Sequence, residues 1–366
     1  MSVDIRVQPM DDVPVHLPES LGFGRVFTRR MFTQRWTADK GWHDATIGPY
    51  RPIALDPAAQ ILHAGQAIFE GTKAYVRPDG GLNLFRVEAN AARFNRSAER
   101  LAMPGLPVER FVEPLAALVA LERAWAPVAD GASLYVRPVM IASEPTFEVR
   151  AAREFLHYIV LSPGGPLFTS GFQPIAIRVS EEHIRAARGG TGAAKTPGNY
   201  AASLAVAEQA RADGYQQVLW LDAVERRYVE EAGAMNVAFV YGGREIVTPA
   251  LSGSILHGIT RDSILRLAPD LGYVVREERL DIDAVLADVA SGRITEAFSM
   301  GTAAVVVPIG RIGHKGRDHV IGDGAAMPVT EHLYRALTDI QYGRSPDPYG
   351  WTRTIAADAV ETVAAG

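Results

Sequence analysis

A single lysine stands in the stretch Arg188-Gly189-Gly190-Thr191-Gly192-Ala193-Ala194-Lys195-Thr196-Pro197-Gly198-Asn199-Tyr200, which is rich in glycine and alanine. Glycine lets a backbone approach a bulky ligand closely, and Pro197 stiffens the segment after the lysine. Tyr200 follows five residues after Lys195, so its phenol could reach the same ligand. The pattern is typical of a lysine that forms a Schiff base, with an exposed loop lysine as the plainer alternative.

Length and composition describe a compact protein of about two domains. The chain has 366 residues, and 48% of them are hydrophobic, enough for a large core. Its 37 Lys and Arg against 42 Asp and Glu give a net charge of −5, so we expect no nucleic-acid partner. No apolar run approaches the roughly 20 residues of a membrane span, and residues 1–6 lack a secretory core. We therefore expect a cytoplasmic location and no membrane partner.

Cysteine and histidine exclude several kinds of chemistry. The chain has no cysteine, which excludes disulfides, thiolate nucleophiles and iron-sulfur clusters. Its nine histidines form no HExxH or His-x-His pattern, and only His314 and His319 lie close together, in a glycine-rich charged loop. We therefore expect no dedicated metal site.

Strand-like and helix-like patterns alternate along the chain, which predicts a mixed α/β fold. An apolar strand ends at Tyr158-Ile159-Val160-Leu161, and Ser162-Pro163-Gly164-Gly165-Pro166 is a linker signal before the next strand. The expected division is an N-terminal domain at 1–161, a linker at 162–172 and a C-terminal domain at 173–366.

Periodicity predicts several elements of these domains. In Leu134-Tyr135-Val136-Arg137 the period of two places Tyr135 and Arg137 on one face of a strand, and Pro138 suggests an edge or bulged strand. We further expect a helix at 201–213, strands at 217–220 and 236–241, and a hairpin through Gly242-Gly243 to a strand at 245–247.

Three further segments carry groups suited to a charged ligand. Thr260 is a natural N-cap for the apolar helix after it, whose first amides could bind a phosphate, although most such starts are ordinary caps. Phe298 to Val307 is strand-like and is entered through a small-residue turn, where Thr302 could bind an anion; the plainer alternative is a buried strand. Glu230 and Glu231 are neighbours in an apolar strand, so only one of them can face a shared site.

Pyridoxal 5′-phosphate needs an amine, a buried carboxylate and a phosphate cradle together. The lysine forms the imine, the carboxylate keeps the pyridine nitrogen protonated, and helix-end amides hold the phosphate. A phosphate-binding P-loop is the alternative for residues 189–196. It fits poorly, because Ala194 replaces the second glycine and Pro197 disturbs the helix expected after the lysine.

The chain resembles the branched-chain aminotransferases of the fold-type IV pyridoxal phosphate enzymes, in particular their bacterial, actinobacterial-looking branch. The resemblance covers nearly the whole chain. Its matching stretches are Phe69 to Tyr75, Asn95 to Ala98, Leu134 to Pro138, the lysine segment, Asp222 to Tyr228, Glu231 to Asn236, Gly258 to Asp262 and Gly301 to Ala304. It implies a two-domain fold with a smaller N-terminal α/β domain and a larger, barrel-like C-terminal α/β domain.

The resemblance also implies roles for individual residues. Lys195 would be the imine lysine and proton shuttle, Glu231 the partner of the pyridine nitrogen, and Tyr200 the partner of the phenolic oxygen. The phosphate would be held by Arg96, Ile259, Thr260 and Thr302. The substrate would be held by Phe69, Tyr135, Arg137 and Ala303. Periodicity alone does not single out Arg96, because Arg93, Arg96 and Arg100 share a helix face that could be solvated.

The activity implied is a ping-pong transamination between an apolar L-amino acid and 2-oxoglutarate, in a homodimer with shared active sites. Three alternatives stay open. They are an aminodeoxychorismate-type lyase, a D-amino acid or amine transaminase, and a non-catalytic cofactor-binding protein.

Departures from the family pattern lie where the substrate side chain should bind. Ala64 and Leu161 stand where the family has aromatic residues, and Phe147 and Glu148 change a loop that in the family reaches the partner's pocket. We expect a pocket enlarged for a bulkier or β-substituted side chain. The alternative is repacking in which Phe147 fills the lost volume.

Overall fold

The computed structural model describes residues 3–11, 13–165 and 172–357, which form two compact units. The first unit comprises Met1–Leu167, Ala194–Pro197 and Asp339–Gly366, and the second comprises Phe168–Ala193 and Gly198–Thr338. Within the described residues, no helix is long and apolar enough to span a membrane.

Three parts of this division differ from the expected one. Ala194–Pro197, expected in the C-terminal domain, belong to the first unit. Residues 162–164, expected in the linker, are the end of a strand that pairs with Ser133 to Tyr135. Residues 339–357, expected in the C-terminal domain, belong to the first unit because the strand Thr352–Ile355 pairs with Leu82 to Phe85. Local sequence carries no signal for a pairing across this separation. Residues 166–171 lie outside the described residues.

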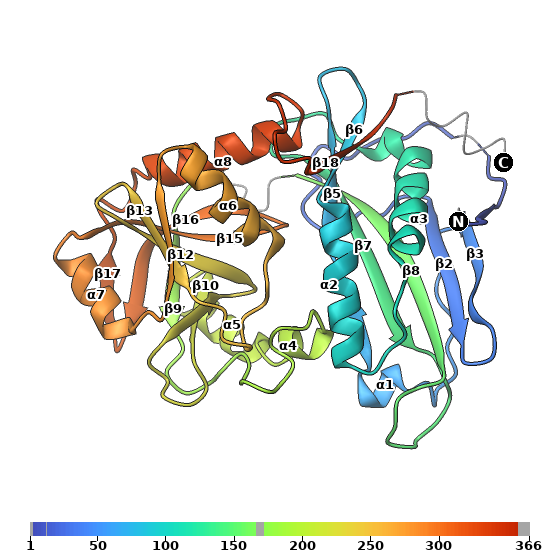
Figure 1. Cartoon of the computed structure of the whole chain (residues 1–366), viewed down its shortest axis with the longest axis horizontal. Coiled ribbons are helices and arrows are strands. Elements are labelled where there is room, and N and C mark those ends of the chain that lie inside the picture. Colours follow the sequence, from blue (N-terminus) through green and yellow to red (C-terminus); the bar gives the residue numbers. More distant parts are fainter. Residues whose placement is uncertain (1–2, 12, 166–171, 358–366) are drawn as a thin grey trace. The chain divides into compact units, whose positions relative to one another are not determined.

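The first unit contains a nine-stranded sheet in the order β1-β3-β2-β8-β7-β5-β6-β18, with β4 paired to β7 (Figure 1). Nearly all of its pairings are antiparallel; β1 and β3 run parallel. Its strands are β1 (Arg6–Val7), β2 (Arg30–Thr37), β3 (Gly41–Pro49), β4 (Ala67–Phe69), β5 (Thr72–Val76), β6 (Leu82–Phe85), β7 (Ser133–Ala142), β8 (Glu154–Gly164) and β18 (Thr352–Ile355).

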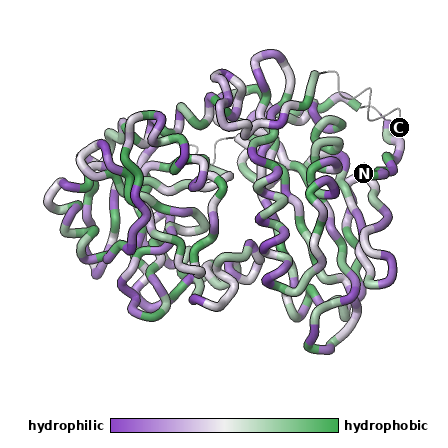
Figure 2. Tube along the Cα trace, in the orientation of Figure 1, coloured by the Kyte–Doolittle hydropathy of each residue, from purple (hydrophilic) through white to green (hydrophobic). Residues whose placement is uncertain are grey.

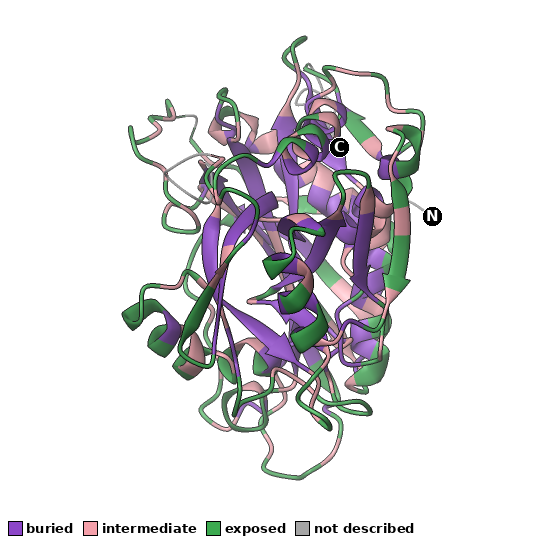
Figure 3. Ribbon diagram, turned by 90° about the vertical axis from the view of Figure 1, so that its left-hand side faces the viewer, coloured by how far each residue is buried: buried purple, intermediate pink, exposed green. Residues whose placement is uncertain are grey.

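Helices α2 (Val87–Arg100) and α3 (Val108–Leu121) cover one face of this sheet. Phe94 of α2 and Phe111 of α3 are fully buried against Phe32 and Ile159 of the strands. Burial of such large apolar side chains is the main favourable term in folding. Figure 3 colours the chain by burial and shows that many strands are buried, whereas helices and loops carry exposed residues. The unit also contains α1 (Ile61–Ala64) and a 3₁₀ turn at Arg123–Trp125.

Pro138 lies inside the first sheet, so the expectation of an edge or bulged strand is wrong. Strand β7 pairs with β8 along its whole length, where Pro138 is opposite Ile159. On its other side, pairing passes from β5 at Val136 to β4 at Val139. The Pro138 carbonyl faces this gap and accepts from Glu70 N at 2.8 Å. The missing N–H of proline therefore falls where the ladder changes partner.

The second unit contains a sheet in the order β11-β10-β9-β16-β15-β12-β13-β14. Because β11 also pairs with β12, the strands from β11 to β12 close into a barrel, as expected. The strands are β9 (Ile175–Val179), β10 (Gln217–Leu221), β11 (Val229–Ala232), β12 (Met235–Tyr241), β13 (Glu245–Pro249), β14 (Val274–Glu278), β15 (Ile294–Gly301), β16 (Val305–His314) and β17 (Arg317–Val320), which pairs with β16.

The local predictions for this unit are largely confirmed. Gly242 and Gly243, both at positive φ, connect β12 to β13 as a hairpin. The expected helix at 201–213 is α5 (Leu204–Ala212). The other helices are α4 (Pro197–Ala201), α6 (Ile259–Asp270), α7 (Ile282–Ala290) and α8 (Pro328–Gln341). Figure 2 shows hydrophobic stretches along the strands of each unit and hydrophilic stretches in many of the loops.

Candidate active site

Backbone hydrogen bonds fix the lysine segment beside β4 in the first unit. Lys195 N donates to Ser97 Oγ of α2 at 2.9 Å, and Phe69 N donates to the Lys195 carbonyl at 3.0 Å. The next residue, Thr196, donates from its hydroxyl to the Ala67 carbonyl at 2.8 Å. These bonds attach a glycine-rich segment to rigid elements, so the Lys195 side chain starts from a fixed position.

The amine of Lys195 lies in a site that favours its neutral form. Its Nζ is 4.9 Å from the centre of the Phe69 ring. Burial lowers the pKa of Lys195 to about 8; nearby Arg93 lowers it further, and Glu70 opposes the shift. An amine with this pKa is partly unprotonated near neutral pH, which a nucleophile requires.

Glu70 and Arg93 form a buried ion pair beside this amine. Arg93 donates to the Glu70 carboxylate through Nε at 2.7 Å and Nη2 at 2.8 Å, and Asn90 Nδ2 and Gly71 N add bonds of 2.7 and 3.0 Å. Burial alone would raise the pKa of Glu70, but Arg93 and these donors outweigh it and hold the pKa below its usual value. Glu70 is therefore a carboxylate fixed by four donors.

Tyr135 and Arg137 lie on one face of β7, as the alternation predicts. Arg137 Nη2 donates to the Tyr135 hydroxyl at 2.9 Å, and its guanidinium lies 4.9 Å from the centre of the Phe69 ring. The Nε of Arg137 is buried and has no hydrogen-bond partner among the described residues. A half-buried cation with an unused, buried donor is suited to bind a carboxylate. Phe69 thus contacts both the Lys195 amine and Arg137.

In the second unit Glu231 is the centre of a second polar cluster. Its side chain is almost fully buried on β11, where Oε1 accepts from Asn236 Nδ2 at 3.1 Å and Oε2 lies 2.5 Å from Arg185 Nε. Its neighbour Glu230 has a different partner, the Ser252 hydroxyl at 3.1 Å. The two carboxylates therefore face opposite ways, as predicted.

The start of α6 is next to this cluster. Gly258 is the N-cap, and no side chain caps the helix. The expectation that Thr260 is the N-cap is therefore wrong, because Thr260 is the second residue of the helix. A Cβ on Gly258 would lie 1.9 Å from Asn236 Oδ1, so any larger residue would displace the Asn236 side chain. A helix start without a side-chain cap can bind a phosphate through its backbone N–H groups.

The small-residue turn after β15 lies near the same end of the barrel. Met300, just before the turn, pairs with Asn236, and Gly301 pairs with Val305, which begins β16. Thr302 and Ala303 form the turn, as the sequence predicts, and both are half-buried. Ile259 and Thr260 are buried at the start of α6.

Three of the other predicted residues are accessible at the surface of their unit. Arg96 is exposed on α2, whereas Arg93 on the same helix points inward to Glu70, so the three arginines do not share one environment. Ala64 is exposed at the end of α1, and Phe147 is 76% exposed, with its ring 5.1 Å from that of His63. Tyr200 is half-buried on α4.

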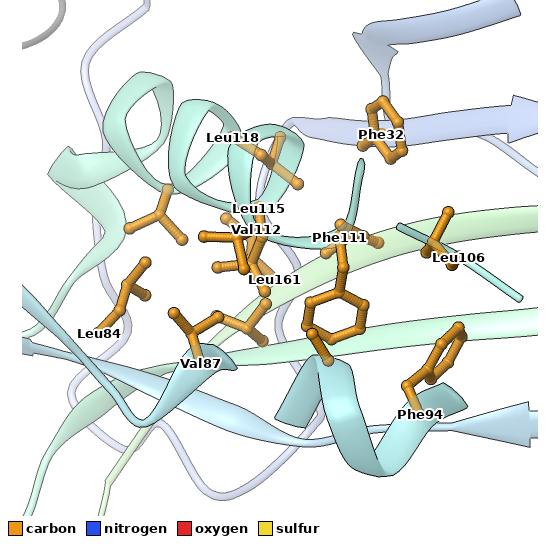
Figure 4. Close-up of a cluster of buried hydrophobic side chains, with 14 of the residues drawn as sticks. Phe32, Leu84, Val87, Phe94, Leu106, Phe111, Val112, Leu115, Leu118 and Leu161 are labelled. Atoms are coloured by element: carbon orange, nitrogen blue, oxygen red, sulfur yellow. The ribbon is translucent and has the colours of Figure 1, made fainter. Parts of the chain in front are cut away.

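Leu161 does not line a pocket, and this expectation is wrong. Its side chain is 1% exposed and packs in the core with residues of α3, including Val112 and Leu115 (Figure 4). Alternation along β8 explains the difference, because Leu161 shares the core face with Phe155 and Ile159.

Sequence reasoning missed four of the residues that hold these clusters together. They are Glu70, Arg93, Arg185 and Asn236. A signal existed for Glu70 and Asn236, because a charged or amide side chain inside an apolar strand pattern needs a buried partner. For Arg185 and Arg93 the partner is distant in sequence, and local pattern does not reveal it.

Comparisons with known proteins identify the class. The family model described as "Amino-transferase class IV" matches residues 67–312, more than half of the chain. A probable branched-chain-amino-acid aminotransferase of Streptomyces coelicolor is 51% identical over 336 residues, which cover 92% of each chain. Branched-chain-amino-acid transaminase 1 of Bacillus subtilis is 49% identical over 336 residues, covering 92% of this chain and 94% of that one.

A solved structure agrees with these matches. The T.th. branched-chain amino acid aminotransferase with pyridoxamine 5′-phosphate is 28% identical, has a TM-score of 0.72, and matches over 87% of this chain and 97% of that one. The chain belongs to the branched-chain amino acid aminotransferases of class IV. The predicted family, mixed α/β fold, aminotransferase activity and pyridoxal phosphate cofactor are thereby confirmed.

Proposed function

We propose that this chain transfers the amino group of valine, leucine or isoleucine to 2-oxoglutarate, with pyridoxal 5′-phosphate bound to Lys195. The observation that carries the proposal is the Lys195 amine, with its pKa lowered to about 8 beside the Phe69 ring. At neutral pH this Nζ exchanges its proton readily, so it can take the proton from the substrate Cα and return it. The bound cofactor supplies the electron sink for this transfer.

The residues present fit each end of that cofactor. An amine of lowered pKa suits its aldehyde, the buried Glu231 carboxylate suits its ring nitrogen, and the uncapped start of α6 suits its phosphate. We assign the phenolic oxygen to Tyr200. The phosphate is assigned to Arg96, Ile259, Thr260 and Thr302.

The second substrate, 2-oxoglutarate, carries a carboxylate where the branched-chain acids are apolar. We propose that Arg137 binds this carboxylate, since its buried Nε lacks a hydrogen-bond partner among the described residues, and that Tyr135 orients it. When an aliphatic donor is bound, Arg137 keeps its contacts to Tyr135 and the Phe69 ring. Ala303 would offer its amide to the α-carboxylate.

The donor is expected to be one of the three aliphatic acids, because Leu161 is a core residue and does not enlarge the pocket. A bulkier or β-substituted donor is the second candidate, favoured by the missing ring at Ala64. Steady-state kcat/KM for valine, leucine, isoleucine, phenylalanine and a β-methylated analogue separates the two. A preference for phenylalanine and the β-methylated analogue, reversed in Ala64→Tyr, would support the bulkier donor and contradict the three aliphatic acids as donors.

We further propose a homodimer in which the loop carrying Phe147 reaches the partner's active site. The support is the 76% exposure of Phe147 close to Val149, which is fully exposed, because large apolar side chains at a loop tip favour a protein partner. Mixing inactive Lys195→Ala and Phe147→Asp chains should restore activity that neither has alone, since a hybrid dimer combines one intact lysine with one intact loop. No recovery after verified subunit exchange would contradict a shared site. A cytoplasmic location stays a prediction.

A further inference from the structure

Arg185 has no assigned role, yet its side chain contacts three separate segments of the second unit. Its side chain is only 8% exposed, and its Nε forms the ion pair with Glu231 Oε2 at 2.5 Å. Its Nη2 donates to the carbonyl of Gly192 at 3.1 Å and to the carbonyl of Ser254. One guanidinium therefore joins the carboxylate on β11 to the loop before Lys195 and the loop before α6.

Asn236 holds the other oxygen of the same carboxylate. Its Nδ2 donates to Glu231 Oε1 at 3.1 Å and to the Leu256 carbonyl at 3.0 Å, and its Oδ1 packs against Gly258. Asn236 and Arg185 are thus partners of different oxygens of Glu231. Of these two partners only Arg185 carries a charge, and a cation at this distance stabilises the charged form of Glu231.

A carboxylate and a pyridine nitrogen that face each other share one proton, which can reside on either atom. A cation close to the carboxylate favours the arrangement in which the carboxylate is negative and the proton is on nitrogen. This stabilisation of the anion is large in a buried site, because burying a carboxylate without a compensating charge is energetically unfavourable. Contact between Arg185 and Glu231 within ion-pair distance meets this condition.

We propose that Arg185 is a positioning residue that holds Glu231 as an anion and thereby keeps the proton on the cofactor's ring nitrogen. The proposal rests on the proposed function, in which Glu231 faces that nitrogen. Without Arg185, Glu231 would keep the proton in its buried site, and the electron sink that the protonated ring provides would weaken. Arg185 acts only through Glu231 and does not touch the substrate.

The test compares two probes, pyridoxal 5′-phosphate and its 1-deaza analogue, which has a carbon at the ring-nitrogen position. Both carry the same aldehyde and phosphate, so the ratio of their dissociation constants reports the ring nitrogen alone. The full-length chain is freed of cofactor and titrated with each probe. A charge-assisted hydrogen bond predicts a wild-type preference for pyridoxal phosphate of about tenfold or more.

Arg185→Gln should lose most of this preference, as should Glu231→Gln, whereas Arg185→Lys should keep the larger part of it because the charge remains. Arg261→Gln is the matched control. Arg261 is also buried in this unit, with Glu277 Oε2 at 2.5 Å and the Pro249 carbonyl at 3.0 Å, and its loss should leave the ratio unchanged.

Each outcome decides the proposal. The proposal is overturned if Arg185→Gln keeps the wild-type ratio of dissociation constants while Glu231→Gln loses its preference for pyridoxal phosphate. It is also overturned if Arg185→Lys loses as much of this preference as Glu231→Gln does. If Arg185→Gln does not fold, the comparison of Arg185→Lys with Glu231→Gln decides between the two outcomes. A wild-type chain that binds neither probe at Lys195 would contradict the proposed function itself, which is a distinct result.

Discussion

Replacing Glu70 by glutamine should destabilise the first unit strongly. Glu70 is fully buried and accepts four hydrogen bonds, two of them from Arg93, whose side chain is 3% exposed. A glutamine offers one acceptor oxygen and turns an N–H₂ group toward these donors. Breaking a buried ion pair from one side costs about 3–5 kcal/mol, because the remaining charge is uncompensated.

Thermal unfolding measures this loss. For a unit of this size, a loss of that magnitude corresponds to a Tm roughly 6–20 °C lower. Glu88→Gln is the matched control on α2, since Glu88 is exposed and its contact with Arg353 is 3.4 Å, for which less than about 1 kcal/mol is expected. A Tm for Glu70→Gln equal to that of Glu88→Gln would refute the reasoning.

The same pair has a second, independent readout at Lys195. Glu70 raises the pKa of the Lys195 amine and Arg93 lowers it, while burial has the largest effect. Glu70→Gln should therefore move the pKa of Lys195 further below 8, whereas Arg93→Met should move it upward. The two variants share a loss of stability but shift the pH profile of amine labelling in opposite directions. Shifts of equal sign would contradict the electrostatic account.

Three further predictions follow from single contacts. Burial lowers the pKa of His157 to about 3, so below pH 6.5 the unfolded chain binds more protons than the folded one. The free energy of unfolding should therefore fall as the pH drops from 6.5 toward 3, and urea titrations at pH 5 should show a loss of about 2 kcal/mol. Tyr135→Phe removes the hydrogen bond to Arg137 and should raise KM for 2-oxoglutarate about fivefold, with KM for valine unchanged. Gly258→Ala places a Cβ 1.9 Å from Asn236 Oδ1 and should weaken pyridoxal phosphate retention about tenfold, measured by equilibrium dialysis.

Each of these predictions has its own contradicting result. His157→Gln should remove the fall in unfolding free energy that is attributed to His157. If the variant loses as much stability with falling pH as the wild type, the pH dependence belongs to other groups. An equal rise of KM for valine and 2-oxoglutarate in Tyr135→Phe would indicate general damage to the pocket. Full cofactor retention in Gly258→Ala would mean that the loop before α6 moves without affecting the phosphate.

Local patterns predicted those features that depend on neighbouring residues. The period of two placed Tyr135 and Arg137 on one face of β7, and the paired glycines at 242 and 243 predicted the hairpin. The same alternation, applied to β8, would have placed Leu161 with Phe155 in the core. The error arose because its role was assigned from family position and not from the strand period.

Features that depend on long-range contacts were not predictable from the sequence. The strand at 352–355 pairs with β6, more than 260 residues earlier, and Pro138 is accommodated only because β4 and β5 share one side of β7. The partners of Glu231 lie 46 residues before it and five after it, as Arg185 and Asn236. Only the fold brings such groups together.

The most direct test of the account is to locate the cofactor on the chain. The protein loaded with pyridoxal phosphate is reduced with borohydride, digested and examined by mass spectrometry. Lys73 provides an internal comparison, because it is also buried and burial lowers its pKa to about 8 as well. We predict the pyridoxyl label on Lys195, whereas a label on Lys73 or another amine, or no label, would contradict the account.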